Sequence, residues 1–487
     1  MSGKERLGGA QAIVSGVLEE FRGLSARPHG SGQEAAETAY FMDRLRRLGL
    51  TPERDEAGNV RADVPPTPGH EGAPLLILQG HMDMVCTAAP GSGFDPVRDT
   101  VTIVTESGFL CSDGRSSLGA DNNLGNAVVL YLLKEGVPHG PLRLLFTVSE
   151  EVGLQGAAQV DSKWLEGAAY LLNTDGFHLG LAVTGSAGGR RETYTRPLVW
   201  CAPHGTEGFC ITLTGGLGGH SGDDIHRGRL NAVVALAQLL EKLSTQFSLE
   251  VADFTGGSGH NAIPGSAQVT VILPAGQGNA LAAACAEAER DLLARYGAAE
   301  PDIRLTAAPI PCPAQVWQAE SRKAVCGLLT GLFCGVYAMH HAFPDVVGAS
   351  ANVGQVFAEN GAAVVRAFIR CARPEEEAIL FPQHDSTAQT HGFALTEVTA
   401  YPSWPGQADS PLVHTLCQIY RAETGRNMTV TAVHVGLEPS VLGAKNPAMV
   451  MVSTGPDIVD AHAVTERAPL AGIPNYAALL AGTLAAL

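Results

Sequence analysis

The chain has 487 residues, of which 45% are hydrophobic and 17% are charged. This balance excludes a disordered chain, which would be rich in charge and poor in apolar residues. The net charge of −17 argues against nucleic acid or an anionic membrane as a partner, and it leaves carboxylates that can bind cations.

The N-terminal segment has Glu5 and other polar residues where a secretory signal needs an apolar core, so we expect a cytoplasmic protein. No apolar run approaches the roughly 18 residues of a membrane-spanning helix. The ten cysteines are scattered and form no C-x-x-C pair. In a cytoplasmic chain of this length, we expect them to be free thiols.

The N-terminal part alternates helical and strand-like segments. Apolar residues recur at helical spacing in the predicted helices, which are 9–24, 31–48 and 123–134. Ser31 and Glu34 have the spacing of a capping box at the start of the second helix. Short apolar runs have the length of buried strands at 75–79, 142–148 and 169–173. The alternation predicts an α/β fold with a mainly parallel sheet.

After residue 190 the pattern changes to that of an inserted α+β domain with antiparallel strands. A helix is expected at about 230–244, and strand-like runs occur at 207–214, 267–273 and 363–370. The segments "HNAIP" (260–264) and "SANVG" (350–354) each precede a strand-like run, which leaves open two similar halves. We predict that this insertion covers residues 191–399.

The α/β pattern returns at about residue 400. Helices are predicted at 411–424 and 474–487, and an apolar run at 448–452 has the character of a buried strand. We therefore predict one discontinuous α/β domain, made of residues 1–190 and 400–487, which the α+β domain interrupts.

Polar side chains follow the predicted strands of the α/β domain. Asp121 lies at the start of the helix at 123–134, and the others follow strand-like runs: His81, Asp83, Glu150, Glu151, Asp175 and His462. Ligand sites of open α/β sheets lie beyond the carboxyl ends of the strands. The sequence therefore predicts that these groups converge on one edge of the sheet.

Each of these residues also has an ordinary explanation when taken alone. His81 and Asp83 could simply face solvent, adjacent glutamates are common in loops, and Asp121 could cap its helix. Together, imidazoles and carboxylates suit a pair of divalent ions, zinc first, with manganese or cobalt as alternatives. Asp83 could accept the second N–H of His81 and fix its tautomer. One of the two adjacent glutamates could bind metal while the other stays free as a base.

Seven segments carry a resemblance to a known family. They occur in the order "GHMDMV" (80–85), "LGADNNLG" (118–125), "SEEVGLQGA" (149–157), "LLNTD" (171–175), "GGHSG" (218–222), "HNAIP" (260–264) and "HVGLE" (434–438). The chain resembles the M20 family of dinuclear metallopeptidases, and within it the bacterial aminoacyl-histidine (Xaa-His) dipeptidases of the PepD type. The resemblance implies a zinc-peptidase-like catalytic domain, a lid domain formed by the insertion, and hydrolysis of dipeptides.

The resemblance also implies a role for each polar residue of the α/β domain. Asp121 would bridge two metal ions, with His81 and Asp175 completing one of them. The second ion would be held by Glu151 and His462. Glu150 would be the general base, and Asp83 would orient His81.

Residues of the insertion would contact the substrate. By the same resemblance, His220 would reach the carbonyl oxygen of the scissile bond, Arg370 would hold the terminal carboxylate, and Asn261 would line the same pocket. The site would then be complete only when the two domains close. Glu438 is a further candidate, for the substrate's amino group. The ordinary alternatives are that Arg370 is an exposed strand residue and Asn261 a turn residue.

Two segments depart from the family pattern and leave the substrate preference open. His462 lies in "DAHAVTER", where "GPHSPDE" would be typical, and "PSVL" follows Glu438 where "CGLF" would be typical. The alternatives are a related deacylase of N-acyl amino acids and a metal-binding protein without turnover, against which the intact Glu150 argues. We expect a small peptide as the substrate and either a monomer or a homodimer.

Overall fold

The computed structural model describes residues 3–487, which form two compact units. The first unit consists of the chain up to Ser186 together with residues 404–432 and 437–487, and the second consists of residues 187–403 and 433–436. The short segment 433–436 was not predicted to belong with the insertion. It directly continues strand β22 (Thr429–Val433), and no change of composition marks it in the sequence.

The first unit is built on a mixed sheet whose central strands are parallel. β3 pairs in parallel with both β6 and β7, and β7 pairs in parallel with β23. The predicted strands at 75–79, 142–148 and 169–173 are confirmed as β3, β6 and β7. Within residues 3–487 eight strands form this sheet, in the order β1 (Glu53–Arg54), β2 (Val60–Val64), β6 (Leu142–Thr147), β3 (Leu75–His81), β7 (Ala168–Asn173), β23 (Val450–Ser453), β8 (Leu181–Ser186) and β22.

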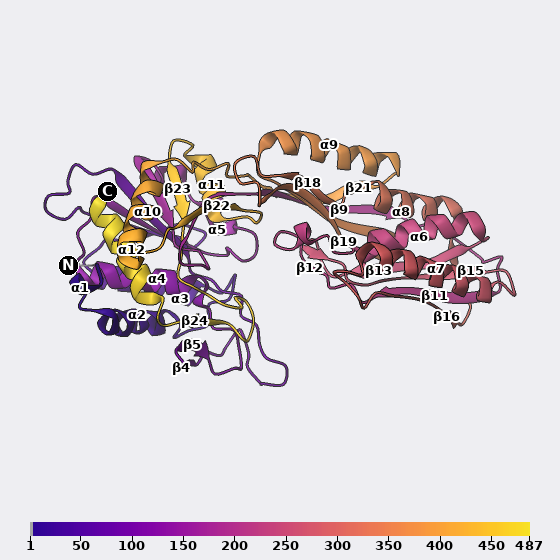
Figure 1. Cartoon of the computed structure of the whole chain (residues 1–487), viewed down its shortest axis with the longest axis horizontal. Helices are drawn as coiled ribbons and strands as arrows, with labels where there is room; N and C mark the ends of the chain where they lie inside the picture. Colours follow the sequence, from indigo (N-terminus) through magenta and orange to yellow (C-terminus); the bar gives the residue numbers. More distant parts are fainter. Residues whose placement is uncertain (1–2) are drawn as a thin grey trace. The chain divides into compact units, whose positions relative to one another are not determined.

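Helices pack against this sheet (Figure 1). α2 (Ala10–Leu24) packs on α4 (Ala120–Glu135) and α12 (Ile473–Ala486), while α4 lies against β3. In α2 the buried apolar residues recur at helical spacing: Ile13, Val17, Leu18, Phe21 and Leu24. α10 (Pro411–Thr424) and α11 (Glu438–Lys445) both pack on β23. In the described part of the chain, no helix is both long and apolar enough to cross a membrane.

A small antiparallel sheet of the first unit joins the chain just before α4 to the chain just after His462. Its order is β24 (Arg467–Pro469), β5 (Phe109–Ser112) and β4 (Ile103–Glu106). β24 begins immediately after Glu466, and it pairs with β5, which precedes α4 by only a few residues. The chain before α4 and the chain after His462 are therefore fixed to each other.

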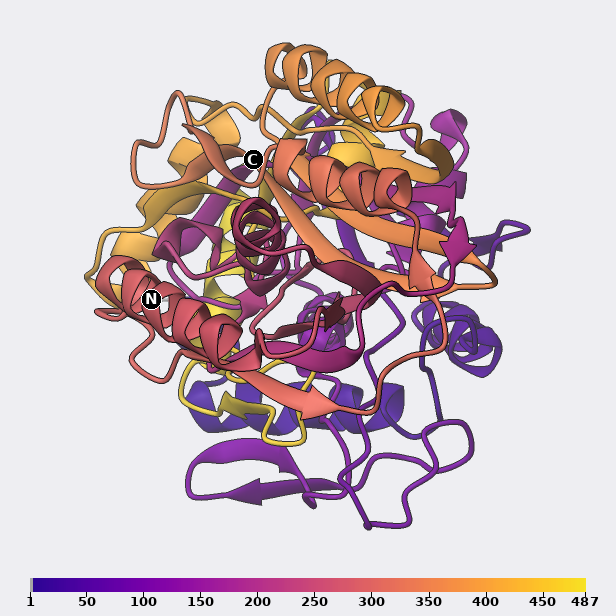
Figure 2. The ribbon, with the colours of Figure 1, turned by 90° about the vertical axis from the view of Figure 1, so that its right-hand side faces the viewer.

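The second unit is a long antiparallel sheet with helices packed on it, which confirms the predicted α+β character (Figures 1 and 2). Helices α6 (Ala232–Gln246), α8 (Ala319–Gly331) and α9 (Pro374–Thr390) lie side by side, and α7 (Gly278–Tyr296) packs on the first strand of the sheet. Within the described residues the strand order is β16 (Arg304–Ile310), β11 (Glu207–Thr214), β15 (Ala267–Leu273), β13 (Glu250–Gly257), β19 (Val347–Glu359), β20 (Ala362–Cys371), β9 (Gly188–Pro197) and β21 (Ala394–Tyr401), with β18 (Gly335–Met339) beside β19.

Two local predictions were wrong. The segment "SANVG" lies inside strand β19 rather than before a strand, because ten residue pairs hold β19 against β20. The capping box at Ser31 and Glu34 does not form, since α3 (Ala35–Arg47) begins without a side-chain cap. Both side chains bind elsewhere in the first unit, as described below. The ten cysteines are free thiols, as predicted.

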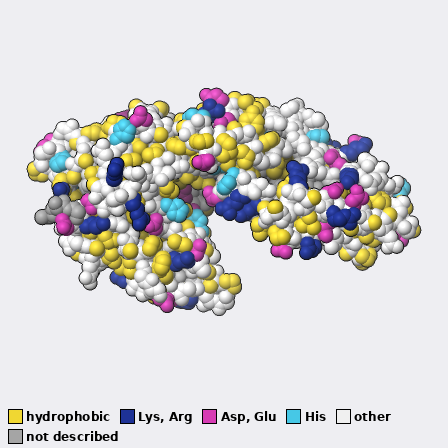
Figure 3. Space-filling view, in the orientation of Figure 1, with side chains coloured by type: hydrophobic (Ala, Val, Ile, Leu, Met, Phe, Trp, Pro, Cys, Tyr) yellow, Lys and Arg dark blue, Asp and Glu magenta, His cyan; other side chains and the backbone are white. Residues whose placement is uncertain are grey.

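Charge on the visible surface is mixed. On the face shown in Figure 3, Lys and Arg side chains are interspersed with acidic side chains over the surface of each unit. On this face, the acidic side chains are not gathered into one patch.

Candidate metal centre

The parallel strands bring the predicted polar residues to one edge of the first sheet. His81 is the last residue of β3 and is in register with Thr147, the last residue of β6. Glu150 and Glu151 follow β6, and Asp175 follows β7. Because the carboxyl ends of parallel strands meet at the same edge, these side chains come together there.

Asp121 lies between two histidines that are far apart in the sequence. Its Oδ1 is 3.0 Å from Nε2 of His81, and its Oδ2 is 2.8 Å from Nε2 of His462. The His81 ring is also 3.6 Å from Oδ1 of Asp175, and the His462 ring is 2.9 Å from Oε1 of Glu151. The five side chains thus form two sets, each with one imidazole and one further carboxylate, that share the Asp121 carboxylate.

Asp83 contacts both the His81 ring and the backbone of the two adjacent glutamates. Nδ1 of His81 is 3.0 Å from the backbone oxygen of Asp83 and 3.5 Å from its carboxylate. The carboxylate accepts hydrogen bonds from the backbone N–H groups of Glu150 (3.0 Å) and Glu151 (3.2 Å) and from the Ser31 hydroxyl (2.7 Å). Ser31 therefore supports Asp83 and does not cap a helix. Asp83 fixes the backbone of both glutamates as well as facing the His81 ring.

Asparagines of the "ADNNLGN" segment attach α4 to the ends of the strands. Asn126 donates to the backbone oxygen of His81 (2.6 Å), and Asn122 donates to that of Thr174 (2.9 Å). The helix approaches so closely that a Cβ at Gly125 would lie 2.7 Å from the backbone oxygen of Thr174. The glycine and the asparagines therefore set the position of Asp121, at the start of the same helix, against the strand that carries His81.

The cluster is largely buried, apart from the His462 side chain, which is 42% exposed, and it holds an excess of carboxylates. Burial raises the pKa of Glu150 well above its usual value, with His81 opposing and Glu151 reinforcing the shift. Burial raises the pKa of Glu151 to about 7 and that of Asp175 to about 6, and the Asp121 carboxylate adds to both. Although burial raises it, hydrogen bonds from two imidazoles hold the pKa of Asp121 below its usual value. Such a concentration of negative charge favours the binding of cations.

The donor set fits divalent metal ions. Imidazole nitrogens and carboxylate oxygens are ligands for zinc, manganese and cobalt. One ligand atom from each of His81, Asp121 and Glu151 lies within 4.8 Å of the others. Among residues 3–487, the only cationic groups within 4.0 Å of the carboxylates of Asp121, Glu151 and Asp175 are the imidazoles of the two histidines. The residues present therefore suit the metal pair that the sequence predicts.

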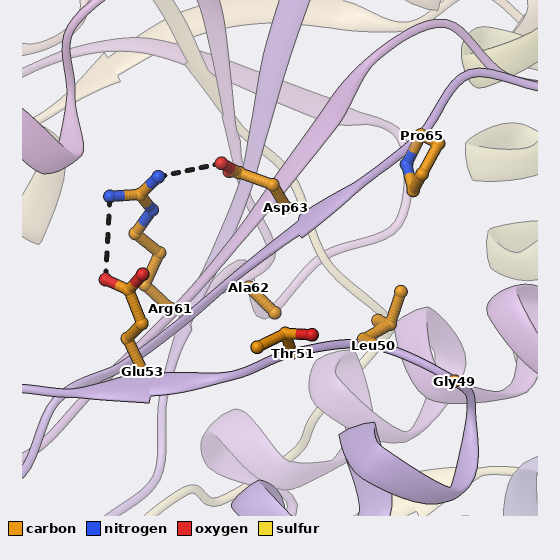
Figure 4. A pocket seen from close by; sticks show the side chains of 8 residues that line it. All are labelled: Gly49, Leu50, Thr51, Glu53, Arg61, Ala62, Asp63 and Pro65. Atoms are coloured by element: carbon orange, nitrogen blue, oxygen red, sulfur yellow. Dashed lines mark hydrogen bonds and ion pairs between the residues drawn. The ribbon is translucent and has the colours of Figure 1, made fainter.

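A pocket elsewhere on the first unit differs from the cluster around Asp121 in its charge balance (Figure 4). It lies beside β1 and β2 and has a volume of about 320 Å³. There the Arg61 guanidinium is 2.7 Å from the Asp63 carboxylate and 3.9 Å from that of Glu53. The Arg143 guanidinium is also 2.7 Å from the Asp63 carboxylate. Because guanidinium groups already neutralise these carboxylates, this pocket does not share the charge excess of the cluster around Asp121.

An apolar pocket opens next to the cluster, within the first unit. Its volume is about 360 Å³, and Glu151 and Ser31 form its polar side. The remaining lining is mainly apolar and consists of Gly30, Gln33, Met84, Val85, Cys86, Pro96, Val97 and Val152. A small organic group could therefore lie beside Glu151.

In the second unit, His220 and Arg370 lie together. Nη2 of Arg370 is 3.3 Å from Nε2 of His220, and Oδ2 of Asp223 is 2.9 Å from Nδ1 of the same ring. The Arg370 side chain is buried against Phe368, 4.1 Å from the ring centroid, so it is not the exposed strand residue of the alternative interpretation. In the described part of the chain no carboxylate lies within 4.0 Å of its guanidinium.

The glycines around His220 have a conformational role. Gly219 has φ of 134°, in the region that side-chain-bearing residues avoid, and it places His220 in the short strand β12 (Gly219–His220). β12 pairs with β14 (Ala262–Ile263), so Asn261 comes directly beside His220, and its backbone oxygen accepts from Ser221 N–H at 2.8 Å. The Asn261 side chain is exposed in a turn.

Glu438 is fully buried in the first unit. It is the first residue of α11, its carboxylate accepts hydrogen bonds from Gln79 and from the Thr147 hydroxyl (2.8 Å), and its Oε1 has no partner among the described side chains. Burial raises the pKa of Glu438 to about 7, and the His81 ring opposes the shift. Its contacts with Gln79 and Thr147 place Glu438 near the carboxyl ends of β3 and β6, where the cluster also lies.

Three residues that hold the centre in place were missed by the sequence analysis. Glu34 accepts from both the N–H and the hydroxyl of Ser149, at 2.9 Å each, and so holds the turn before Glu150. Ser31 donates a hydrogen bond to Asp83, and Glu466 accepts one from the backbone at the start of α4. A sequence signal for Glu466 was present, because the typical segment "GPHSPDE" also has a glutamate four residues after its histidine.

Comparisons with known proteins show the family of the chain. A profile of peptidase family M20/M25/M40 matches residues 77–486. The cytosol non-specific dipeptidase of Escherichia coli (strain K12) is 31% identical over 462 residues, 94% of this chain and 95% of that protein. Aminoacylhistidine dipeptidase from Vibrio alginolyticus matches with a TM-score of 0.85 and 31% identity, over 97% of this chain and 96% of that one.

More distant structures share the fold alone. Human carnosine dipeptidase 1 is 13% identical, with a TM-score of 0.54 over 99% of this chain and 98% of that one. The sequence resemblance is thus confirmed by a family match that covers most of the chain and by two relatives of nearly equal length. The chain belongs to peptidase family M20/M25/M40.

Proposed function

We propose that this protein is a metal-dependent dipeptidase whose substrates include dipeptides of the Xaa-His type. The observation that carries the proposal is the Asp121 carboxylate, whose two oxygens each face a different histidine. The E. coli relative is named for a non-specific dipeptidase activity and the Vibrio relative for aminoacylhistidine substrates. A broad dipeptide specificity that includes histidine at the second position is consistent with both.

The metal pair would be held by five side chains. Asp121 would bridge the ions, His81 and Asp175 would complete one, and Glu151 and His462 the other. When bound, such ions polarise a peptide carbonyl and acidify water. The donor set accepts zinc, manganese or cobalt, and zinc is our first choice because two imidazoles are present.

Glu150 would act as the general base. Its carboxylate takes the proton of the attacking water and then gives it to the nitrogen of the leaving amine. The raised pKa that burial gives Glu150 suits a group that must accept and release a proton near neutral pH. Asp83 would keep His81 and the Glu150 backbone in place through the contacts described above.

His220 would bind the carbonyl oxygen of the scissile bond, which belongs to the first residue of the dipeptide, and Arg370 would bind the terminal carboxylate of the second residue. In the present arrangement Arg370 donates to Nε2 of His220, so that nitrogen acts as an acceptor. A substrate carboxylate would draw the guanidinium away, and a protonated Nε2 could then donate to the carbonyl oxygen of the scissile bond. Asn261 would line the same pocket, and Glu438 would face the substrate's amino group.

A panel of substrates tests this function. Metal-free protein reloaded with zinc, manganese or cobalt should hydrolyse dipeptides, including Xaa-His and β-alanyl-histidine. Acetylated amino acids serve as the comparison. Their hydrolysis in the absence of any dipeptide hydrolysis would favour a deacylase instead, and bound metal without any turnover would favour a metal-binding protein.

Replacement of Arg370 by lysine should raise KM for dipeptides by about 10- to 100-fold. A hydrogen bond to a charged group contributes ~1.5–3 kcal/mol, and lysine cannot reproduce the bidentate contact of a guanidinium. Steady-state kinetics on a dipeptide and metal analysis of the same preparation measure the effect, and the metal content should not change.

The control for Arg370→Lys is Arg366→Lys on the same strand. Arg366 donates to Gln355 (3.0 Å) and stacks on Phe357, and we give it no contact with the substrate. Its KM should equal that of the wild type. Equal rates of the wild-type enzyme on dipeptides and on their C-terminal amides would contradict the role of Arg370.

Location and assembly are further parts of the proposal. We place the enzyme in the cytoplasm, in line with the cytosolic E. coli relative. We expect each chain to supply its own His220, whether the protein is a monomer or a homodimer.

A further inference from the structure

We propose that Glu466 is a positioning residue of the metal centre. Its carboxylate fixes the backbone that carries Asp121 and ties it to the loop that carries His462. The inference rests on the proposed metal-dependent function, but it concerns a residue to which that function gives no role.

One carboxylate accepts four successive backbone N–H groups. Oε2 of Glu466 accepts from Leu118 (2.8 Å) and Gly119 (2.9 Å), and Oε1 accepts from Ala120 (2.8 Å) and Asp121 (3.4 Å). The Glu466 side chain is buried, with 2% of the residue exposed. No other described carboxylate accepts from as many consecutive N–H groups.

These contacts leave the Asp121 carboxylate free to face the two histidines, because it does not have to cap the helix. The first N–H groups of a helix have no partner within the helix, and an acidic side chain at its start commonly binds them. α4 has no such cap from its own first turn. Of the four N–H groups that Glu466 accepts, those of Leu118 and Gly119 precede α4, and those of Ala120 and Asp121 belong to its first turn. Because Glu466 accepts them from outside the helix, both oxygens of Asp121 remain turned toward the two histidines.

Glu466 also belongs to the loop that carries the second histidine. His462 has φ of 67°, a left-handed conformation that a residue with a side chain keeps only when its surroundings hold it. The His462 backbone oxygen accepts from the Thr87 hydroxyl (2.7 Å), and Glu466 N–H closes a turn on Ala463 (3.0 Å). Immediately after Glu466 the chain enters β24.

Glu466 therefore connects the bridging carboxylate and one imidazole of the centre. If its carboxylate no longer accepts the four N–H groups, the start of α4 and the His462 loop can shift relative to each other. Loss of a residue that orients metal ligands usually lowers metal affinity by about 10- to 100-fold. The effect should therefore appear in metal binding before it appears in substrate binding.

The test is calorimetric titration of the metal-free full-length protein with Zn²⁺. Glu466→Gln keeps the size of the side chain but replaces one acceptor oxygen by an NH₂ group that faces N–H donors. Its affinity for Zn²⁺ should fall by about 10- to 100-fold. The zinc concentration that gives half-maximal activity should rise by the same factor, while KM for a dipeptide at saturating zinc stays at the wild-type value.

A matched control separates positioning from general stability. Glu250→Gln also removes an acceptor from a carboxylate that binds two backbone N–H groups, those of His204 and Gly205 at 2.9 Å each, but in the second unit. It should bind Zn²⁺ like the wild type. A purely structural role for Glu466 would lower the melting temperature of the metal-free Glu466→Gln variant and leave its zinc affinity unchanged.

The outcomes distinguish this inference from the proposed function. Wild-type zinc affinity in Glu466→Gln overturns the inference, whereas a wild-type protein that binds no divalent ion overturns the proposed function. If Glu466→Gln does not fold, Glu466→Asp decides. Its carboxylate is one carbon shorter and cannot reach all four N–H groups, so a lowered affinity supports the inference and a wild-type affinity overturns it.

Discussion

Glu150→Ala is expected to lower kcat for dipeptide hydrolysis by about 10²–10⁴-fold, the usual contribution of a general base. The backbone at this position is held by Asp83, which accepts from its N–H at 3.0 Å, so the substitution removes the carboxylate and leaves the turn in place. Because Glu150 is not among the five proposed ligands, metal analysis of the purified variant should still give two ions per chain. Initial rates at saturating dipeptide measure the loss.

The control for Glu150→Ala is an exposed glutamate of the same unit. The Glu166 side chain is exposed, and Glu166→Ala should retain the wild-type rate. If Glu150→Ala itself stays near the wild-type rate, the base must be Glu151 or another group.

His220→Ala is expected to lower kcat by about 10²–10³-fold and to leave the metal content unchanged. This is the typical effect of removing one donor to a developing oxyanion. The Asp223 carboxylate lies 2.9 Å from Nδ1 and holds the orientation of the ring. Single-turnover rates with excess enzyme would separate the chemical step from product release. The control is His226→Ala, an exposed histidine six residues along the same loop, which should behave as wild type.

Mixing the two variants shows which chain supplies the histidine. If His220 acts within its own chain, an equimolar mixture of His220→Ala and Glu150→Ala has no more activity than the two variants measured separately. Restored activity would mean that one chain lends His220 to the metal centre of another. That result would overturn the within-chain assignment without affecting the metal ligands.

The parts of the fold that sequence could predict are those where local pattern and tertiary environment agree. The runs at 75–79, 142–148 and 169–173 are mostly apolar because β3, β6 and β7 lie in the middle of the sheet. Polar residues just past their ends were therefore recognisable as a cluster. Once the strands are parallel, the edge at which His81, Glu150 and Asp175 meet follows from the topology.

What sequence could not supply are contacts made by ordinary residues over long distances. Ser31 and Glu34 have the spacing of a helix cap, yet they bind Asp83 and Ser149, to which nothing in the local sequence points. Strand β19 is rich in glycine, alanine and serine and has no apolar run, since its stability comes from pairing with β20 and β18. Glu466 binds groups almost 350 positions earlier in the chain.

The place of β23 has a consequence for how the protein is made. β23 lies between β7 and β8, but residues 187–403 are translated after both of those strands and before β23. A growing chain therefore carries a central sheet whose β7 edge still has unpaired N–H and C=O groups, and such edges invite wrong pairings. His462 and Glu466 emerge from the ribosome only after β23 does. If the five proposed ligands hold the metal ions, the nascent enzyme lacks its second histidine ligand, and cannot hydrolyse peptides in the cell that makes it, until the strand that completes its sheet has been added.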